Sequence, residues 1–306
     1  MNEKVGLFNG IAMYVMWGLF PLFWTLLSDV NSFDTLANRI VWSCVFSIGA
    51  MLVLRKSRSF MHTLQALWQE PKKVVLLFFA SLCISGNWFV YIWAVANAQI
   101  IDASLGYYIN PLLSILCGML IYKEKLHRGQ QVALAVAAIG VVLMIVNFGE
   151  VPYVALSLAF TFAMYGVVKK SIPLEALHSV AIETLFMLPI AAGYLIYLML
   201  QGTAAFGHID RTTDIVLMLS GVVTIIPLIC FAIAARNLPL YILGFLQYMT
   251  PTMTLLFGIF LYGETFTRAD FMSFSFIWVA LIIFSVTTYR QQRKRVRHKQ
   301  VITGAK

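Results

Sequence analysis

The chain has few charged residues for its length. Of its 306 residues, 11% are charged and 60% are hydrophobic. A soluble globular domain carries about 25% charged residues, so this composition excludes an ordinary soluble protein. The connections between apolar runs are also short, the longest falling at 55–72 and 200–214, which leaves no room for an ATPase domain. We therefore expect an integral membrane protein that draws no energy from ATP.

Metal-binding and catalytic motifs are lacking as well. All four cysteines fall inside apolar runs, with no Cys-x-x-Cys pair and no His-rich spacing, and this position predicts buried packing residues. No His-Glu-x-x-His, Gly-x-Ser-x-Gly or phosphate-binding Gly-rich loop occurs. The sequence contains neither rings of like charge nor a filter-like loop, so it does not indicate a channel. We expect no enzyme activity, no metal and no cofactor.

Long apolar runs recur along the whole chain. A hydrocarbon layer about 30 Å thick needs about 20 such residues per helix. Ten runs have roughly this length: 5–27, 34–54, 73–96, 102–122, 128–146, 150–169, 176–199, 215–235, 239–262 and 267–289. The first run continues without a small-residue cleavage site, so we expect it to be retained.

The basic residues are concentrated in alternate loops of the predicted membrane protein. Of the 22 Lys and Arg residues, all except Arg39, Arg211 and Arg268 fall at the N-terminus, in alternate loops or in the tail 290–306. The positive-inside rule then predicts that both termini lie in the cytoplasm. The formal net charge of +9 is thus explained by topology, with the tail lying against an acidic lipid leaflet, so we expect the bilayer and not nucleic acid as partner.

The chain repeats itself at a separation of 140 residues. The pattern Pro-x6-Gly-x3-Tyr-x-Glu begins at Pro111 and again at Pro251, and the matching pairs continue on both sides. Each copy contains five apolar runs, which divides the chain into a first repeat at 1–148, a second at 149–289 and the basic tail at 290–306. Internal repeats of this kind define the architecture before any single motif does.

An odd number of helices per repeat makes the second copy enter the membrane from the opposite face. We therefore predict an all-α membrane protein with ten transmembrane helices in two inverted five-helix repeats. Inverted repeats with a binding site near the midplane are the recurrent architecture of secondary transporters.

Several motifs in the sequence resemble those of a known protein family. They are GNW at 86–88, ASLGYYINP at 103–111, the pattern GFxQYxxPT at 244–252 and FIWVAL at 276–281. With the repeated Pro-x6-Gly-x3-Tyr-x-Glu pattern, they make the chain similar to the EamA-type permeases of the drug/metabolite transporter superfamily. More narrowly it resembles the RarD subfamily, whose members are often labelled chloramphenicol-sensitive proteins or permeases. The resemblance covers nearly the whole chain and implies a transporter in the bacterial inner membrane.

Two ionisable residues fall well inside the predicted spans, Arg39 and Glu183. Such residues are functional candidates by default, because a charge at membrane depth is costly. Arg39 would hold a carboxylate or another anionic group, and Glu183 would be a proton-coupling acid. The alternative is that both reach an interface or pair with polar neighbours. Since the two helices run in opposite directions, the residues flank the midplane, and an ion pair between them stays open.

A second set of candidates is polar or aromatic. Asn87, Asn110 and Gln247 carry amides that would orient a ligand or join helices. The aromatic candidates for a cavity wall, each with ordinary packing as the alternative, are Trp17, Trp42, Trp88, Tyr107, Tyr108, Tyr165 and Tyr248. Pro111 and Pro251 each remove a backbone donor inside an apolar run and predict a helix kink.

The sequence thus predicts a secondary transporter for a small amphipathic metabolite or drug, working by alternating access and with protons as a candidate coupling ion. Export is favoured by the resemblance. Uptake, or a role as a membrane scaffold or sensor without transport, is the alternative, and the sequence leaves the oligomeric state open.

Overall fold

The computed structural model describes residues 2–27, 29–96, 100–148, 153–172, 174–260 and 268–303. Within these ranges the chain is helical and contains no β-strand. This confirms the all-α prediction. A helix suits a lipid environment because it satisfies its own backbone hydrogen bonds.

The helices follow one another with short connections. The first part of the chain forms α1 (Glu3–Gly18), α2 (Phe20–Trp24), the 3₁₀ turn η1 (Thr25–Leu27), α3 (Ser32–Val53), α4 (Ser57–Trp68), α5 (Pro71–Ala96), α6 (Ile100–Ile121) and α7 (Arg128–Phe148). The second part forms α8 (Tyr153–Ser171), α9 (Ala176–Gln201), α10 (Arg211–Asn237), α11 (Leu240–Gln247), α12 (Met249–Phe260) and α13 (Arg268–Thr303).

Local capping explains where several helices begin and end. The Asn31 side chain accepts a hydrogen bond from the Phe33 amide (2.9 Å) at the start of α3. Asp210 accepts one from the Thr213 amide (2.8 Å) at the start of α10, and this bond lowers the pKa of Asp210 below its usual value. At the end of α9, Gly202 takes a φ of 67°, which favours glycine.

Six helices of the described chain are long and apolar enough to cross a membrane. They are Ser32–Val53, Pro71–Tyr91, Arg128–Val146, Ala176–Gln201, Arg211–Asn237 and Phe271–Arg290, and each coincides with a predicted span. In α6 the apolar part that the structure describes, Gly106–Ile121, is shorter. Many large apolar side chains on these helices are exposed, for example Leu120 and Leu200, as lipid-facing residues are.

Two predicted spans are not single helices. The span at 5–27 ends its first helix at Gly18, and Leu19 turns the chain before α2. The span at 239–262 is divided at Tyr248, whose amide bonds to the Phe245 carbonyl (3.3 Å) in a tight turn between α11 and α12. In both places a proline follows within three residues and lacks the amide that a continuous helix needs.

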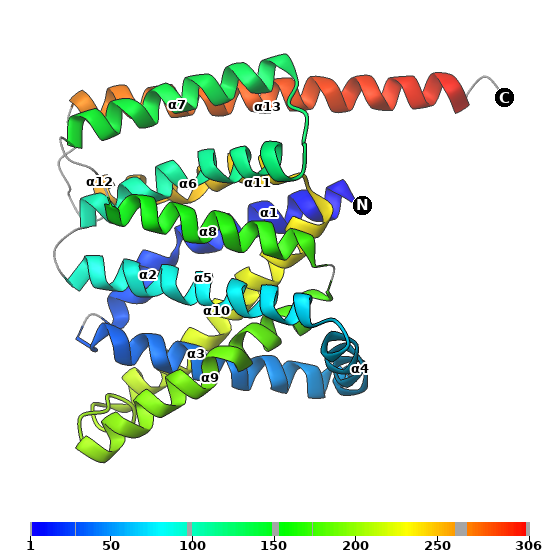
Figure 1. The fold of residues 1–306 in the computed structure, drawn as a ribbon. Helices are drawn as coiled ribbons and strands as arrows, with labels where there is room; N and C mark the ends of the chain where they lie inside the picture. The colour runs from blue at the N-terminus through cyan, green and yellow to red at the C-terminus, as the bar shows by residue number, and fades with distance from the viewer. Residues whose placement is uncertain are drawn as a thin grey trace.

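The helices pack in layers, as Figure 1 shows. α7 and α13 lie side by side as an outer layer, and α6 packs on both α8 and α11. At the opposite side of the molecule α3 packs on α9 and α10, while α5 packs on α8. The N-terminus and the C-terminal part of α13 lie at the same end of the bundle.

Close helix approach occurs where α6 meets α11. A Cβ on Gly244 would lie 2.8 Å from the Pro111 carbonyl oxygen and 2.6 Å from the Ile115 side chain, so only glycine fits there. The fourth and ninth apolar runs, 102–122 and 239–262, thus meet through α6 and α11.

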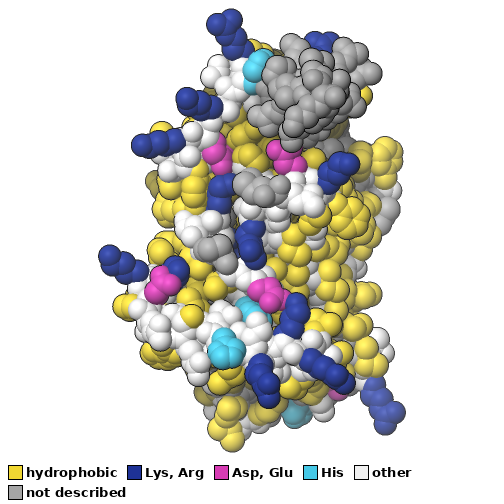
Figure 2. Space-filling view, turned by 90° about the vertical axis from the view of Figure 1, so that its right-hand side faces the viewer, with side chains coloured by type: hydrophobic (Ala, Val, Ile, Leu, Met, Phe, Trp, Pro, Cys, Tyr) yellow, Lys and Arg dark blue, Asp and Glu magenta, His cyan; other side chains and the backbone are white. Residues whose placement is uncertain are grey.

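One end of the bundle is strongly basic. Figure 2 shows lysine and arginine side chains over the end that carries α4 and the start of α5. Exposed basic residues there include Arg55, Arg58, Lys72 and Lys123. α4 is seen nearly end-on in Figure 1, so it runs across the bundle axis at this basic end.

Candidate functional site

A cavity of about 130 Å³ lies between helices of both halves of the chain. Its wall is mainly aromatic, with a single charged residue among the lining side chains. The lining consists of Tyr14, Trp17, Phe20, Trp24, Arg39, Asn87, Trp88, Tyr91, Gly106, Tyr107, Asn110, Leu158, Phe162, Gln247, Thr250 and Pro251. An apolar cavity with a few converging polar groups is the usual form of a small-molecule site.

Arg39 supplies the charge in the cavity. It is the eighth residue of α3, about 10 Å along the helix, and is 9% exposed. Its Nε donates to Thr224 Oγ1 of α10 (2.6 Å). The guanidinium carbon lies 4.0 Å from the centre of the Trp88 ring and 4.9 Å from that of Trp24. These contacts hold a buried cation by cation–π attraction.

The three amide candidates are all buried and all line the cavity. Asn87 Nδ2 donates to the Leu158 carbonyl (2.7 Å) and to Thr161 Oγ1 (2.9 Å), so it also joins α5 to α8. Gln247 Oε1 accepts from Ser114 Oγ (3.4 Å) between α11 and α6. Asn110 differs, because its Oδ1 is buried and has no hydrogen-bond partner among the described residues.

The aromatic candidates divide into two groups. Trp17, Trp88 and Tyr107 line the cavity. Outside its lining, Trp42 packs on Phe46 and Phe206, Tyr108 donates to the Pro251 carbonyl (3.2 Å), Tyr165 contacts Glu183, and Tyr248 is fully buried. The structure thus brings three of these seven candidates to the cavity.

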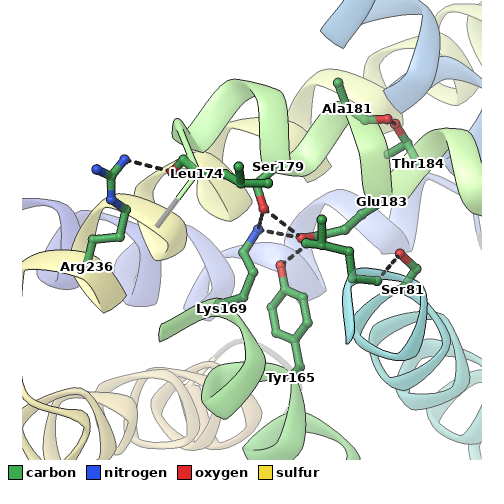
Figure 3. A network of polar contacts seen from close by, with 10 residues as sticks. Ser81, Tyr165, Lys169, Leu174, Ser179, Ala181, Glu183, Thr184 and Arg236 are labelled. Carbon is green, nitrogen blue, oxygen red and sulfur yellow. Dashed lines mark hydrogen bonds and ion pairs between the residues drawn. The ribbon is translucent and has the colours of Figure 1, made fainter. Parts of the chain in front are cut away.

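Glu183 lies in a separate polar cluster between α8 and α9, drawn in Figure 3. Its Oε1 accepts from Lys169 Nζ (2.7 Å) and from Ser179 Oγ (3.0 Å), while Oε2 accepts from the Tyr165 hydroxyl (3.1 Å). The side chains of Lys169 and Glu183 are 2% and 4% exposed. A buried ion pair of this kind is stable only while both partners are present.

Arg39 and Glu183 do not form an ion pair, since Arg39 bonds to Thr224 and Glu183 bonds to Lys169. Trp88 nevertheless borders both sites. It lines the large cavity and also a second space of about 20 Å³ that Glu183 lines. A space of this size accommodates about one water molecule.

The two predicted kink prolines lie in different local settings. Pro111 is inside the continuous helix α6, where its missing amide leaves a carbonyl without its helical partner. Pro251 is in the first turn of α12, where no amide donor is needed, and it lines the cavity. The proline of the repeated motif therefore lies inside a helix in the first half and at the start of a helix in the second half.

Known sequences match this chain over almost its full length. The EamA-like transporter family matches it twice, over residues 4–146 and 152–286. The chain belongs to the EamA-like transporter family. Its relatives include the uncharacterized transporter YojE of Bacillus subtilis, 43% identical over 97% of this chain and 99% of that protein. The protein RarD of Salmonella typhi is 40% identical over 96% of this chain and 99% of its own length.

The EamA-like family assignment settles the class of protein. The RarD protein of Escherichia coli is 38% identical over 96% of this chain and 98% of its own length, so the expected resemblance to RarD is confirmed. Because relatives carry the name transporter, the chain is a multi-pass bacterial membrane permease and not an enzyme. A solved crystal structure with 18% identity shares the fold, with a TM-score of 0.70 over 94% of this chain and 99% of its own.

Sequence reasoning missed several residues of this EamA-like permease. Lys169 reads as a loop residue that marks topology, because Lys170 follows it at the end of a span. A signal was present: Lys169 follows Tyr165 by four residues, and Glu183 follows Ser179 by four, so each pair shares one helix face. Tyr14, Tyr91 and Phe162 of the cavity wall had no distinguishing signal, because the chain contains 43 aromatic residues of which 23 are Phe, 13 Tyr and 7 Trp.

Proposed function

We propose that this EamA-like permease is a secondary transporter that moves a small amphipathic solute across the bacterial inner membrane, in the direction of export. The observation that carries the proposal is the cavity. Its wall combines helices from both halves of the chain, and it contains one cation and three amides within a largely aromatic lining. These groups bind a solute that has both an apolar body and a polar end.

Two inverted five-helix repeats, at 1–148 and 149–289, supply the alternating motion. Helix contacts support this division, because the packing of α5 on α8 has a counterpart with the halves exchanged in the packing of α1 on α10. The two family matches fall within the same halves. Ten spans follow when α1 with α2 and η1 counts as one span, α11 with α12 as another, and α4 as a surface helix.

The basic end of the bundle faces the cytoplasm, which puts both termini and the tail 290–306 inside the cell. The positive-inside rule supports this orientation, since loops near the cytoplasmic face carry an excess of Lys and Arg. The cavity then lies toward the outer half of the membrane, because Arg39 is in the part of α3 that is distant from the basic end. Glu183 lies about 10 Å into α9 from the basic end.

Glu183 couples transport to protons. Its Oε1 accepts two hydrogen bonds, one of them from the Lys169 ammonium, and protonation of the carboxylate would remove the negative charge with which that ammonium pairs. Protonation thus loosens the contact between α8 and α9. Trp88, which lines both the cavity and the space beside Glu183, conveys the change to the bound solute.

Transport in proteoliposomes tests the proposal. Vesicles containing the purified chain are loaded with a bacterial metabolite extract, and mass spectrometry follows which solutes leave with and without a pH gradient. We expect gradient-dependent loss of a small set of solutes from wild-type vesicles, and gradient-independent or absent loss with Glu183→Gln. Wild-type vesicles that release no solute beyond empty controls would refute transport, and pH dependence retained in Glu183→Gln would refute the coupling role.

A further inference from the structure

Arg39 is a buried cation that has no counter-charge among the residues that the structure describes. No ion pair joins it to an Asp or Glu in the described part of the chain, whereas buried Lys169 has Glu183 as partner. Taking a charge out of water is unfavourable unless an opposite charge accompanies it. The cation–π contacts to Trp88 and Trp24 compensate in part, and a bound anion would complete the compensation.

The charge of the cavity limits the anion to one negative charge. Among the described residues that line the cavity, Arg39 is the single charged one, with no Lys and no second Arg. A phosphate dianion would therefore bring excess negative charge into a wall of aromatic rings. A monocarboxylate matches the single cation and the planar geometry of a guanidinium group.

The remaining atoms of Arg39 leave room for this contact. Nε is occupied by Thr224, and one face of the guanidinium lies against Trp88. The terminal nitrogens have no hydrogen-bond partner among the described residues, and the group lines the cavity. They can donate in the plane of the group to both oxygens of a carboxylate.

Asn110 adds a second requirement. It belongs to the same wall, it is 4% exposed, and its Oδ1 is a buried acceptor without a donor in the described structure. A ligand with a hydroxyl or an N–H next to its carboxylate would satisfy this acceptor. The rings of Trp17, Tyr91 and Phe162 offer the apolar body of such a ligand a stacking surface.

We infer that this site takes an aromatic monocarboxylate with a hydrogen-bond donor beside the carboxylate, the carboxylate lying on Arg39 and the donor on Asn110. The inference rests on the proposed function, since it names the class of solute that the cavity receives. It separates the roles of two residues, because Arg39 recognises charge and Asn110 recognises the donor.

Isothermal titration calorimetry on the purified full-length chain tests the ligand class with four probes. Mandelate carries the carboxylate, the ring and an adjacent hydroxyl. Phenylacetate lacks the hydroxyl, mandelamide lacks the charge, and benzylamine reverses it. We expect mandelate to bind about tenfold more tightly than phenylacetate, and both neutral mandelamide and cationic benzylamine to bind at least about tenfold more weakly than mandelate.

Variants assign the two contacts. Arg39→Gln should weaken mandelate by about tenfold or more, and Arg39→Lys by less, because it keeps the charge and loses the fork. Asn110→Leu should remove the difference between mandelate and phenylacetate while leaving phenylacetate affinity within about twofold. The control Arg58→Gln, at an exposed arginine of α4 outside the cavity lining, should leave all affinities unchanged.

Equal binding of mandelate and mandelamide to the wild-type chain would overturn the inference, and so would absence of mandelate binding. Both comparisons use the wild-type chain and stay decisive if an Arg39 variant fails to fold. Binding is measured without transport, so these results concern the ligand class alone. The proposed function fails separately, when vesicles release no solute of any kind.

Discussion

At the scale of single residues, the environment of each buried charge decides what it does. Lys169 and Glu183 neutralise one another between α8 and α9, with Ser179 and Tyr165 satisfying the remaining oxygen positions. In the part of the chain that the structure describes, Arg39 contacts aromatic faces and one hydroxyl, and no carboxylate. The charges of Lys169 and Glu183 are thus neutralised within the protein, whereas the charge of Arg39 is available to a ligand.

The buried pair predicts a specific pattern of stability. Lys169→Met leaves the Glu183 carboxylate buried without its cation and should cost about 3–5 kcal/mol. The double variant Lys169→Met with Glu183→Leu removes both charges and should cost much less. Reversible unfolding in mixed detergent micelles measures these differences.

A surface pair serves as control for this prediction. Lys56 and Glu175 are each roughly two-fifths exposed, and removing an exposed pair costs at most about 1 kcal/mol. Lys56→Met should therefore be nearly neutral. If Lys169→Met were as mild as Lys56→Met, the Lys169–Glu183 pair would not be the buried unit described above.

At the scale of helices, a residue of the first half caps a helix of the second. Glu124 Oε1 accepts from the Leu240 amide (2.8 Å) and Oε2 from the Tyr241 amide (3.0 Å), at the start of α11. Lys170 joins the same carboxylate (3.1 Å). A negative charge at a helix N-terminus is favourable, since the free amides and the helix dipole both point toward it.

We predict that Glu124→Ala destabilises the chain by about 1–3 kcal/mol, because two amide donors at the start of α11 lose their acceptor. Gly118→Ala should act in the same direction, since a Cβ there would lie 2.5 Å from Glu124 Oε2. Thermal unfolding in detergent followed by circular dichroism measures both.

The matched control for Glu124 is Glu70→Ala, which removes an exposed glutamate paired with Lys73 (2.7 Å) near the start of α5. It should lower stability by less than about 1 kcal/mol. If Glu124→Ala and Glu70→Ala had the same melting temperature, the Glu124 cap would not hold α11 in place.

The helix scale also shows what the sequence could predict and what it could not. The lengths of the apolar runs predicted the positions of six helices, because the thickness of the bilayer dictates the length of a span. These helices are α3, α5, α7, α9, α10 and the membrane part of α13. The break at Leu19 was missed, since hydropathy does not register a single turn. Pro251 indicated a kink in the ninth span, but not the complete break at Tyr248 three residues before it. Burial of Arg39 and Glu183 was predictable from their depth, whereas the partners Thr224 and Lys169 depend on how helices distant in sequence pack.

At the scale of the whole molecule, the cavity requires both halves of the chain. α3, α5 and α6 contribute Arg39, Asn87 and Asn110, while α11 and α12 contribute Gln247 and Thr250. A movement of one half against the other therefore changes the cavity as a unit, which is the basis of alternating access in inverted-repeat transporters.

Two-sided thiol labelling tests this central claim most directly. In a chain whose four native cysteines are replaced by serine, Thr250→Cys places one thiol in the cavity wall. Control cysteines at the exposed positions Ser59 and Thr203 mark the basic and the opposite end of the bundle. A membrane-impermeant maleimide is added either to intact cells lacking an outer membrane or to inside-out vesicles.

We expect Ser59→Cys to react only in inside-out vesicles and Thr203→Cys only in intact cells, as the positive-inside orientation requires. Thr250→Cys should react in both preparations if the cavity opens in turn to each side, as the proposed alternating access requires. Reaction of Thr250→Cys from one side alone, with both controls behaving as expected, would contradict alternating access and with it the account of this protein as a transporter of two rocking repeats.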